Sequence, residues 1–221
     1  MQNVQRVLRT KAEAKATYDR LSRWYDLLGK SSEGPLVAKG LRLLNVQSSK
    51  HVLEIGFGTG HGLVALAQAV GITGKVYGID LSSGMLSTAR TRIDQAGLSD
   101  RVTLSHGDAL QLPYATGSFD AVFMSFTLEL FDTPDIPIVL KESHRVLRRG
   151  GRLGVVSMSK ACQSSVMVKL YEWAQRRFTS LIDCRPIYVQ TAISMAGFQC
   201  DEVDTRSMWG LPVEVVIARK V

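Results

Sequence analysis

An apolar segment runs directly into glycines in the stretch VLEIGFGTGHG, residues 52–62, where every second position from Gly56 to Gly62 is glycine. Because glycine loses more conformational entropy on folding than any other residue, such a cluster indicates a place where side chains are excluded. The chain must turn sharply there, or a ligand must approach its backbone closely. A strand, a glycine turn and a helix in this order are typical of a dinucleotide or nucleoside site.

Three acidic residues follow successive apolar segments around this turn. Glu54 precedes the glycines, Asp80 ends the next segment, and Asp108 ends the one after it. The two carboxylate oxygens of Asp80 can accept from both hydroxyls of a ribose, and Asp108 can accept from an exocyclic adenine amine. Glu54 either accepts from backbone N–H groups of the turn or binds the amino acid portion of a ligand. One such acid alone would equally suit a helix cap, but the three together predict a nucleoside site.

Strand-like and helix-like segments alternate on either side of these residues. We expect strands at 50–55, 74–80, 101–108, 118–126 and 152–158, and helices at 63–70, 82–97 and 135–149 that end at or before glycine. Ser82 or Ser83 is the expected N-cap of the helix at 82–97. The segment 118–126 is apolar almost throughout, as expected when both faces of a strand are covered. This alternation predicts an α/β fold with a doubly wound, mostly parallel sheet.

Further segments lie outside the alternation. Residues 10–44 read as helices before the sheet begins, 162–182 as an inserted helix, 188–198 as a shorter helix, and 199–208 and 212–220 as a final pair. We expect a single domain over residues 1–221, with a helical cap at 1–48, a ligand-binding core at 49–158, and lid helices with the last strands at 159–221. The added helices are placed to cover the crevice beyond the strand ends, where α/β sheets bind ligands.

Composition excludes several classes of protein. The 221 residues are 45% hydrophobic with a net charge of +7, and the basic residues are scattered, which favours a basic surface over a dedicated nucleic-acid site. No apolar run approaches the roughly 18 residues of a membrane-spanning helix, and the first residues are too polar for a secretory signal. Cys162, Cys184 and Cys200 are too far apart for a zinc pattern, and we expect no metal. A cytoplasmic protein is expected.

The segments VLEIGFGTGHG, GKVYGIDLSSGML, HGDALQLPYATGSFDAVFMSF and LKESHRVLRRGGRLGVV resemble the successive motifs of the class I S-adenosylmethionine-dependent methyltransferases. The chain is most similar to the group with the quinone-ring C-methyltransferases and bacterial phospholipid N-methyltransferases, and YDRLSRWYDLL at 18–28 belongs to that resemblance. It implies a Rossmann-like methyltransferase fold of seven strands, the last of which, PVEVVIARK, runs antiparallel.

The resemblance also implies where S-adenosylmethionine binds. Gly56, Gly58 and Gly60 with Phe57 would line its pocket, Asp80 would hold the ribose, and Glu54 would meet the loop or the amino acid portion. The remaining contacts fall on both halves of the cofactor: Leu81 and Met85 flanking the adenine, Asp108 and Ala109 at its edge, Ser125 and Phe126 near the methionine half, and Tyr18 and Tyr25 closing over that half.

The acceptor is expected to be a small molecule or lipid, either a quinone-type ring or a phospholipid amine. The chain lacks the Met-Asn of the early quinone signature and has Ser157 where those enzymes have a glutamate. Nucleic-acid methylation is not expected, because SFTLEL at 125–130 replaces the Asp/Asn-Pro-Pro-aromatic motif. Val4, Val7 and Leu8 among basic residues predict a peripheral membrane contact.

Glu129, just after the fourth strand, is the candidate base or polar anchor for the acceptor, with Tyr25 as a second catalytic candidate. His61 and His106 are interpreted as structural. Aromatic and basic residues in 160–190 are expected to roof the substrate, although a helix with one core face explains the same pattern. Two alternatives remain: a nicotinamide-dependent oxidoreductase, despite His61 at the third glycine position, and a catalytically silent protein that keeps the fold as a scaffold.

Overall fold

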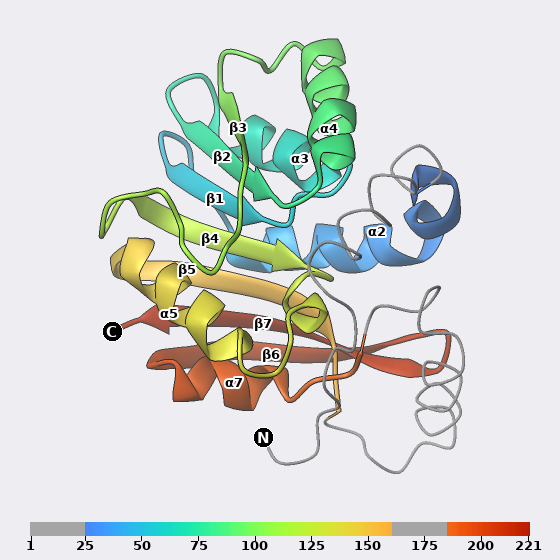
Figure 1. Ribbon diagram of the computed structural model, residues 1–221, viewed down its shortest axis with the longest axis vertical. Helices are drawn as coiled ribbons and strands as arrows, with labels where there is room; N and C mark the ends of the chain where they lie inside the picture. Colours follow the sequence, from blue (N-terminus) through green and yellow to red (C-terminus); the bar gives the residue numbers. More distant parts are fainter. Residues whose placement is uncertain (1–24, 161–184) are drawn as a thin grey trace.

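The computed structural model describes residues 25–160 and 185–221, with side chains from residue 33 onward (Figure 1). Its centre is a seven-stranded sheet with strand order β3-β2-β1-β4-β5-β7-β6. The strands are β1 His51–Ile55, β2 Lys75–Asp80, β3 Val102–His106, β4 Phe119–Ser125, β5 Leu147–Met158, β6 Phe198–Met208 and β7 Leu211–Lys220. Strands β1 to β5 pair in parallel, whereas β7 is antiparallel to both β5 and β6. The predicted seven-stranded, mostly parallel sheet with an antiparallel last strand is confirmed.

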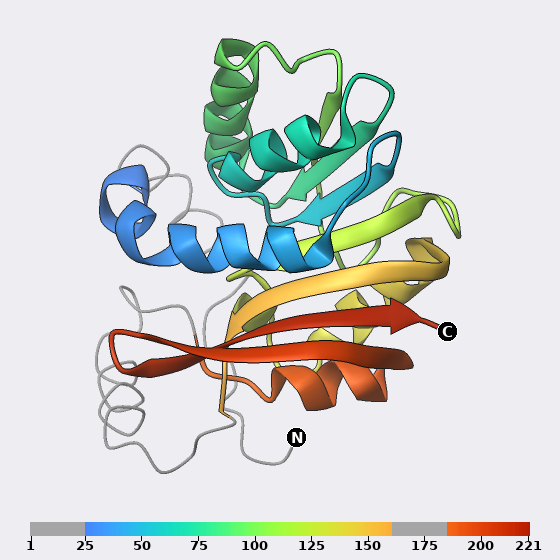
Figure 2. The same cartoon turned by 180° about the vertical axis from the view of Figure 1, so that it is seen from behind.

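Helices cover both faces of the sheet. The helices α2 Tyr25–Leu44, α3 His61–Val70 and α4 Ser83–Gln95 lie on one face, and α5 Ile136–Val146 and α7 Val189–Met195 on the other (Figures 1 and 2). A short 3-10 helix, η1 Leu128–Leu130, follows β4. Two buried apolar clusters result, one under each helical layer. The sheet is therefore buried on both sides, which explains the apolar sequence of its central strands. No helix in the described ranges is long and apolar enough to cross a membrane.

Helix α2 is a single helix where the sequence predicts a break between two. It runs through Gly34 and Pro35 and bends along its length (Figure 2), as expected where proline removes a helical N–H group. Its second half is fixed by close packing: a methyl group on Gly40 would lie 2.6 Å from Val156 Cγ2. Packing on β5 and β7 therefore holds this half of the helix against the sheet. The predicted boundaries of a cap at 1–48, a core at 49–158 and a lid at 159–221 stay predictions.

The boundary between α5 and β5 differs from the prediction. The sequence predicts a helix up to the glycines at 150–151, but α5 ends at Val146 and β5 begins at Leu147, which pairs with Phe119. Carbonyl oxygens at this junction are satisfied from another element, because Lys220 Nζ donates to those of His144 in the last turn of α5 and Leu147 at the start of β5, each at 2.7 Å. This cation comes from β7, so local sequence could not indicate it. Helix α7 is likewise shorter than the predicted 188–198.

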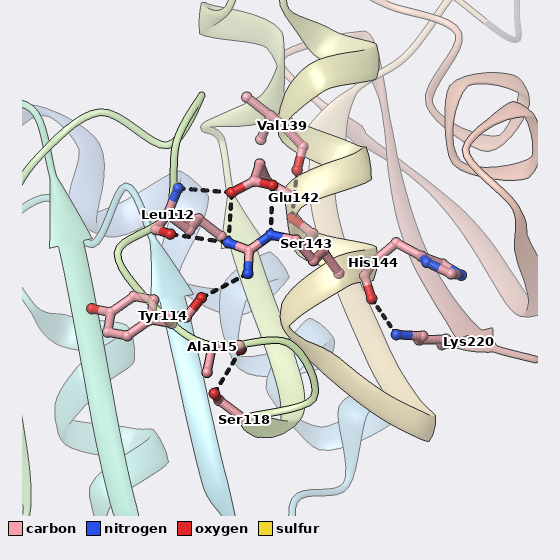
Figure 3. A network of polar contacts seen from close by, with 10 residues as sticks. Leu112, Tyr114, Ala115, Ser118, Val139, Glu142, Ser143, His144 and Lys220 are labelled. Atoms are coloured by element: carbon pink, nitrogen blue, oxygen red, sulfur yellow. Dashed lines mark hydrogen bonds and ion pairs between the residues drawn. The ribbon is translucent and has the colours of Figure 1, made fainter.

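One polar network fixes the connection between β3 and β4 to α5 (Figure 3). Arg145 donates to Glu142 from Nε and Nη2, each at 2.7 Å, and to the carbonyl oxygens of Tyr114 at 2.7 Å and Leu112 at 3.0 Å. Glu142 in turn accepts from the Leu112 N–H at 2.9 Å. The segment that follows Asp108 is therefore held against a helix rather than left as an open loop, which positions the carboxyl end of β3.

Candidate active site

The glycine turn after β1 is built from three left-handed residues. Gly56, Gly58 and Gly60 have φ values of +70°, +52° and +87°, which side-chain-bearing residues adopt only with strain. Packing also excludes a side chain at two of them: a methyl group would lie 2.3 Å from Thr127 Cγ2 at Gly56 and 2.9 Å from Ala89 Cβ at Gly60. At Gly58 the same methyl group would meet no atom within 4 Å. The bend thus presents bare backbone to open space at its middle glycine.

Asp80, at the end of β2, faces this bend. Its Oδ2 accepts from the Gly58 N–H at 2.9 Å, and its Oδ1 accepts from the Ser82 N–H at 2.8 Å. Ser82 Oγ in turn accepts from the Met85 N–H at 3.1 Å and caps α4, as predicted. The Asp80 carboxylate lies directly against the bare backbone of the bend, next to the open space at Gly58. This arrangement fits the ribose and adenosyl groups of S-adenosylmethionine.

Glu54 lies inside the sheet below the same bend. Its side chain is buried, and its Oε1 would be 2.2 Å from a methyl group on Gly62, so this glycine leaves room for the carboxyl. Within the described part of the chain, its Oε2 has no hydrogen-bond partner. Burial, and then the negative charge of Asp80, raise the pKa of Glu54 well above its usual range. A buried oxygen without a partner beside the bend is suited to a donor on a ligand.

The residues expected at the adenine lie at neighbouring strand ends. The Gly107 N–H donates to the Asp80 carbonyl oxygen at 3.0 Å, which joins the end of β3 to that of β2. Asp108 Oδ1 accepts from the Leu110 N–H at 3.0 Å, while Ala109 and Met85 are buried and Leu81 is half-buried. His106 Nε2 lies 2.9 Å from the Leu81 carbonyl oxygen, consistent with its structural interpretation. Phe57 turns its ring into the core, so only its backbone lies on the bend.

The end of β4 is tied to the glycine bend. The Thr127 hydroxyl donates to the carbonyl oxygens of Ser125 at 2.9 Å and Gly56 at 3.2 Å. Phe126, between Ser125 and Thr127, is buried and has φ +48°. Its N–H donates to the Val156 carbonyl oxygen at 2.7 Å. A bulky residue in the left-handed region is uncommon and persists where surrounding contacts fix it, often at functional sites. Ser125 and Phe126 therefore lie next to the bend, as the resemblance implies.

Glu129 lies two residues further on, in η1. It is fully buried, and its Oε1 accepts from the Met158 N–H at 3.2 Å at the end of β5. Burial is the main cause that raises the pKa of Glu129 to about 7. Hydrogen bonds from its own backbone, the Ser157 hydroxyl and the Met158 backbone oppose this rise, and the charge of Glu33 adds to it. Burial also raises the pKa of Glu33 to about 7. Sequence reasoning missed Glu33, although it is the only acidic residue between Asp26 and Glu54.

The remaining predicted residues fall outside these contacts. Tyr18 and the lid segment from 161 to 184 lie outside the described residues, and Tyr25 begins α2 without a described side chain. Arg185, one of the basic residues in 160–190 that are expected to roof the substrate, is buried instead. It donates to Thr133 Oγ1 at 2.9 Å and to the Phe131 carbonyl oxygen. In the described ranges, no three His, Cys, Asp or Glu side chains form a metal site.

A sheet with an antiparallel seventh strand, and a glycine bend that faces strand-end carboxylates, define the class I methyltransferase fold. Residues 52–151 match the methyltransferase domain family. The demethylmenaquinone methyltransferase of Geobacillus stearothermophilus is 45% identical over 111 residues, which cover 50% of this chain and 46% of that protein. The match therefore spans about half the length of this curated relative. The resemblance to the S-adenosylmethionine-dependent methyltransferases, and within them to the quinone-ring group, is confirmed.

Solved structures show the same fold over more of the chain. A SAM-dependent methyltransferase from Aquifex aeolicus has a TM-score of 0.68 at 22% identity, with 90% of this chain and 98% of that one covered. The cyclase SpnF has a TM-score of 0.75 at 17% identity, with 96% and 97% covered. A methyltransferase and a cyclase thus share this architecture, so the activity must be argued from the site. The comparisons give no support to the nicotinamide-dependent oxidoreductase.

Proposed function

We propose that the protein is an S-adenosylmethionine-dependent methyltransferase whose acceptor is a quinone-type ring. The observation that carries this proposal is the bend at Gly58, where bare backbone, open space and the Asp80 carboxylate meet. The demethylmenaquinone methyltransferases that resemble the core of this chain support a reduced quinone as the acceptor. A phospholipid amine is the second acceptor class that the sequence favours.

The cofactor would supply an activated methyl group on a sulfonium, and the chain would position and enclose it. Asp80 would accept from the ribose hydroxyls, and Glu54 from the ammonium of the methionine portion. The other contacts would come from the strand ends: Leu81 and Met85 beside the adenine, Asp108 and Ala109 at its edge, and Ser125 and Phe126 near the methionine half. Buried Phe126 and Leu128 would keep water from the transferred methyl group.

Two measurements test this function. Calorimetry should detect binding of S-adenosylhomocysteine and no binding of NAD. Incubation with methyl-labelled S-adenosylmethionine should then place label in reduced demethylmenaquinone rather than in phosphatidylethanolamine vesicles. Label in the vesicles would instead identify a phospholipid amine as the methyl acceptor. Binding of NAD without binding of S-adenosylhomocysteine would overturn the proposal.

A peripheral membrane contact through residues 1–11 belongs to the same proposal, because a long-tailed quinone resides in the bilayer. Arg6, Arg9 and Lys11 lie outside the described residues, and their basic character is what supports the contact. Co-sedimentation with anionic liposomes should fall when residues 1–11 are deleted. Unchanged co-sedimentation would remove the membrane contact and leave the methyl transfer proposal intact.

A further inference from the structure

Glu129 occupies a position from which a carboxyl could reach a methyl acceptor. It follows the carboxyl end of β4, where ligands bind in α/β sheets. Thr127, two residues earlier, contacts the glycine bend directly. The Glu129 side chain is 0% exposed. Its Oε1 accepts from Met158, whereas its Oε2 has no hydrogen-bond partner in the part of the chain that the structure describes.

An unpartnered oxygen on a fully buried carboxyl is costly. Buried polar atoms in native proteins nearly always have a partner, and leaving one without destabilises the fold, more so if the group is charged. The chain could have removed this cost with an apolar residue at position 129, next to buried Leu128. A donor from a bound molecule explains why it keeps a carboxyl there.

A second carboxyl approaches from the opposite direction. Helix α2 extends past the carboxyl ends of β1 and β4 (Figures 1 and 2), and Glu33 lies in its N-terminal half, half-buried. Helix α2 thus brings Glu33 to the same end of the sheet as Glu129, and the charge of Glu33 adds to the raised pKa of Glu129.

Two further charged groups at this end of the sheet, Glu214 and Arg185, make hydrogen bonds to other residues. Glu214 on β7 pairs in register with Ser157 of β5, and hydrogen bonds from Ser159 and the Gln190 backbone lower its pKa against the burial that raises it. Arg185 donates to Thr133 and to the Phe131 carbonyl oxygen. Glu33 and Glu129 thus stand apart as two neighbouring carboxyls whose pKa values are raised to about 7.

We propose that Glu129 and Glu33 form a carboxyl pair that binds a ring hydroxyl of the methyl acceptor and takes its proton. This inference rests on the proposed function, and it names the acceptor class as a neutral ring with an ionisable hydroxyl, such as a hydroquinone. The hydroxyl would be the missing partner of Glu129 Oε2, and half-buried Glu33 would connect the pair to solvent.

In the proposed step the acceptor O–H bond breaks, its proton passes to Glu129 Oε2, and its electron pair stays on the oxygen. The neighbouring ring carbon becomes electron-rich and forms the bond to the methyl group, while the methyl–sulfur bond breaks and sulfur keeps that electron pair. The ring carbon then loses its hydrogen as a proton to the Glu33 carboxylate, and Glu129 returns a proton to the ring oxygen. One proton leaves through Glu33, which balances the lost positive charge of the sulfonium.

The test compares Glu129→Gln, Glu33→Gln and the control Glu214→Gln, a buried carboxyl at the same end of the sheet that has partners. All three should bind S-adenosylhomocysteine as the wild type does. Glu129→Gln should lower kcat for methylation of reduced demethylmenaquinone by about 100-fold or more, the usual loss when a general base is removed. Glu33→Gln should lower kcat, because it removes the acceptor of the ring-carbon proton. It should also move the acid limb of the kcat–pH profile to lower pH, because it removes a charge that raises the pKa of Glu129. Glu214→Gln should change neither.

A readout without turnover separates this inference from the proposed function. Infrared spectra of the ligand-free protein should show a protonated carboxyl band that titrates near pH 7. Glu129→Gln should remove the Glu129 part of this band and leave the Glu33 part. Glu33→Gln should remove the Glu33 part and shift the rest to lower pH, and Glu214→Gln should leave the band near pH 7 unchanged. A wild type that shows the band but methylates no quinone would overturn the proposed function and retain the pair. Full activity in Glu129→Gln, or no band near pH 7, would overturn the pair whatever the acceptor is.

Discussion

Asp80 combines two tasks that the sequence could not separate. Its two oxygens accept from the N–H groups of Gly58 and Ser82, and the same carboxylate is our candidate for the ribose. The residue therefore shapes the bend before any ligand arrives. A ligand hydroxyl would use the remaining lone pairs of a carboxylate that is already fixed in place, at little cost in side-chain entropy.

Asp80→Ala should weaken S-adenosylhomocysteine binding by about 1.5–3 kcal/mol, the typical loss for hydrogen bonds to a charged group. Calorimetry measures this directly. Asp120→Ala is the matched control, since Asp120 accepts from the His51 N–H at 2.9 Å and from Arg148 at 2.9 Å at the opposite end of the strands. It should lower the melting temperature without changing affinity. An equal loss of affinity in both variants would refute the ribose assignment.

Glu129 should make stability depend on pH in an unusual direction. Its pKa is raised from 4.5 to about 7, so the unfolded chain ionises first, and folding becomes less favourable as pH rises between these values. Glu129→Gln keeps an acceptor for Met158 and removes this penalty. Urea unfolding should show a gain of about 3 kcal/mol at pH 8, from roughly 1.4 kcal/mol per pKa unit, and a smaller gain at pH 5.

Glu142 supplies the opposite case for comparison. Hydrogen bonds from Arg145 lower the pKa of Glu142, so its contribution to stability is present above its unfolded pKa and lost as pH falls through the folded one. Glu142→Gln should therefore destabilise the protein at pH 8. If both variants change stability with the same sign at pH 8, the pKa of Glu129 is not raised.

At the scale of elements, a substitution in the bend between β1 and α3 should affect cofactor binding far more than folding. Gly58→Ala should fold with a modest loss of stability, because φ +52° is strained for alanine but open space surrounds the new methyl group. It should abolish measurable S-adenosylhomocysteine binding, since that methyl group would occupy the cofactor's space. Calorimetry and thermal unfolding measure the two effects.

Gly97→Ala is the control for backbone strain. Gly97 has φ +66° with nothing within 4 Å of the added methyl group, but it follows α4, away from the bend. The two variants should lose similar stability, and only Gly58→Ala should lose affinity. Normal binding by Gly58→Ala would show that the cofactor does not approach this backbone.

The elements that the sequence predicted well are those with local signals. The strands of the parallel half and the Ser82 cap of α4 follow from short patterns, and so do the bend and its acids. The predicted break in α2 and the long helix before β5 are wrong because distant residues decide both. Gly40 packs on Val156, and Lys220 completes the end of α5. The proposed pairing of Glu33 with Glu129 could not be predicted from the sequence for the same reason, because almost 100 residues separate the two.

At the scale of the molecule, the two halves of the sheet hold different groups of candidate functional residues. The half from β3 to β4 holds the cofactor candidates, whereas β5, β7 and α2 surround the Glu129 end. The ion pair between Lys39 of α2 and Asp204 of β6 joins the beginning of the described chain to its last hairpin. Candidate cofactor and acceptor sites thus depend on different parts of the chain, and the glycine bend is where they meet.

The position of β7 between β5 and β6 has a consequence for biosynthesis. Strand β5 emerges from the ribosome with one edge lacking its partner, because that partner is the last strand of the sheet to be made. Until β7 inserts between β5 and β6, the nascent chain exposes an apolar strand edge of the kind that pairs with other chains. Productive folding of this half therefore requires β7, and holding the emerging polypeptide apart from its neighbours until β7 is made would favour the native state over aggregation.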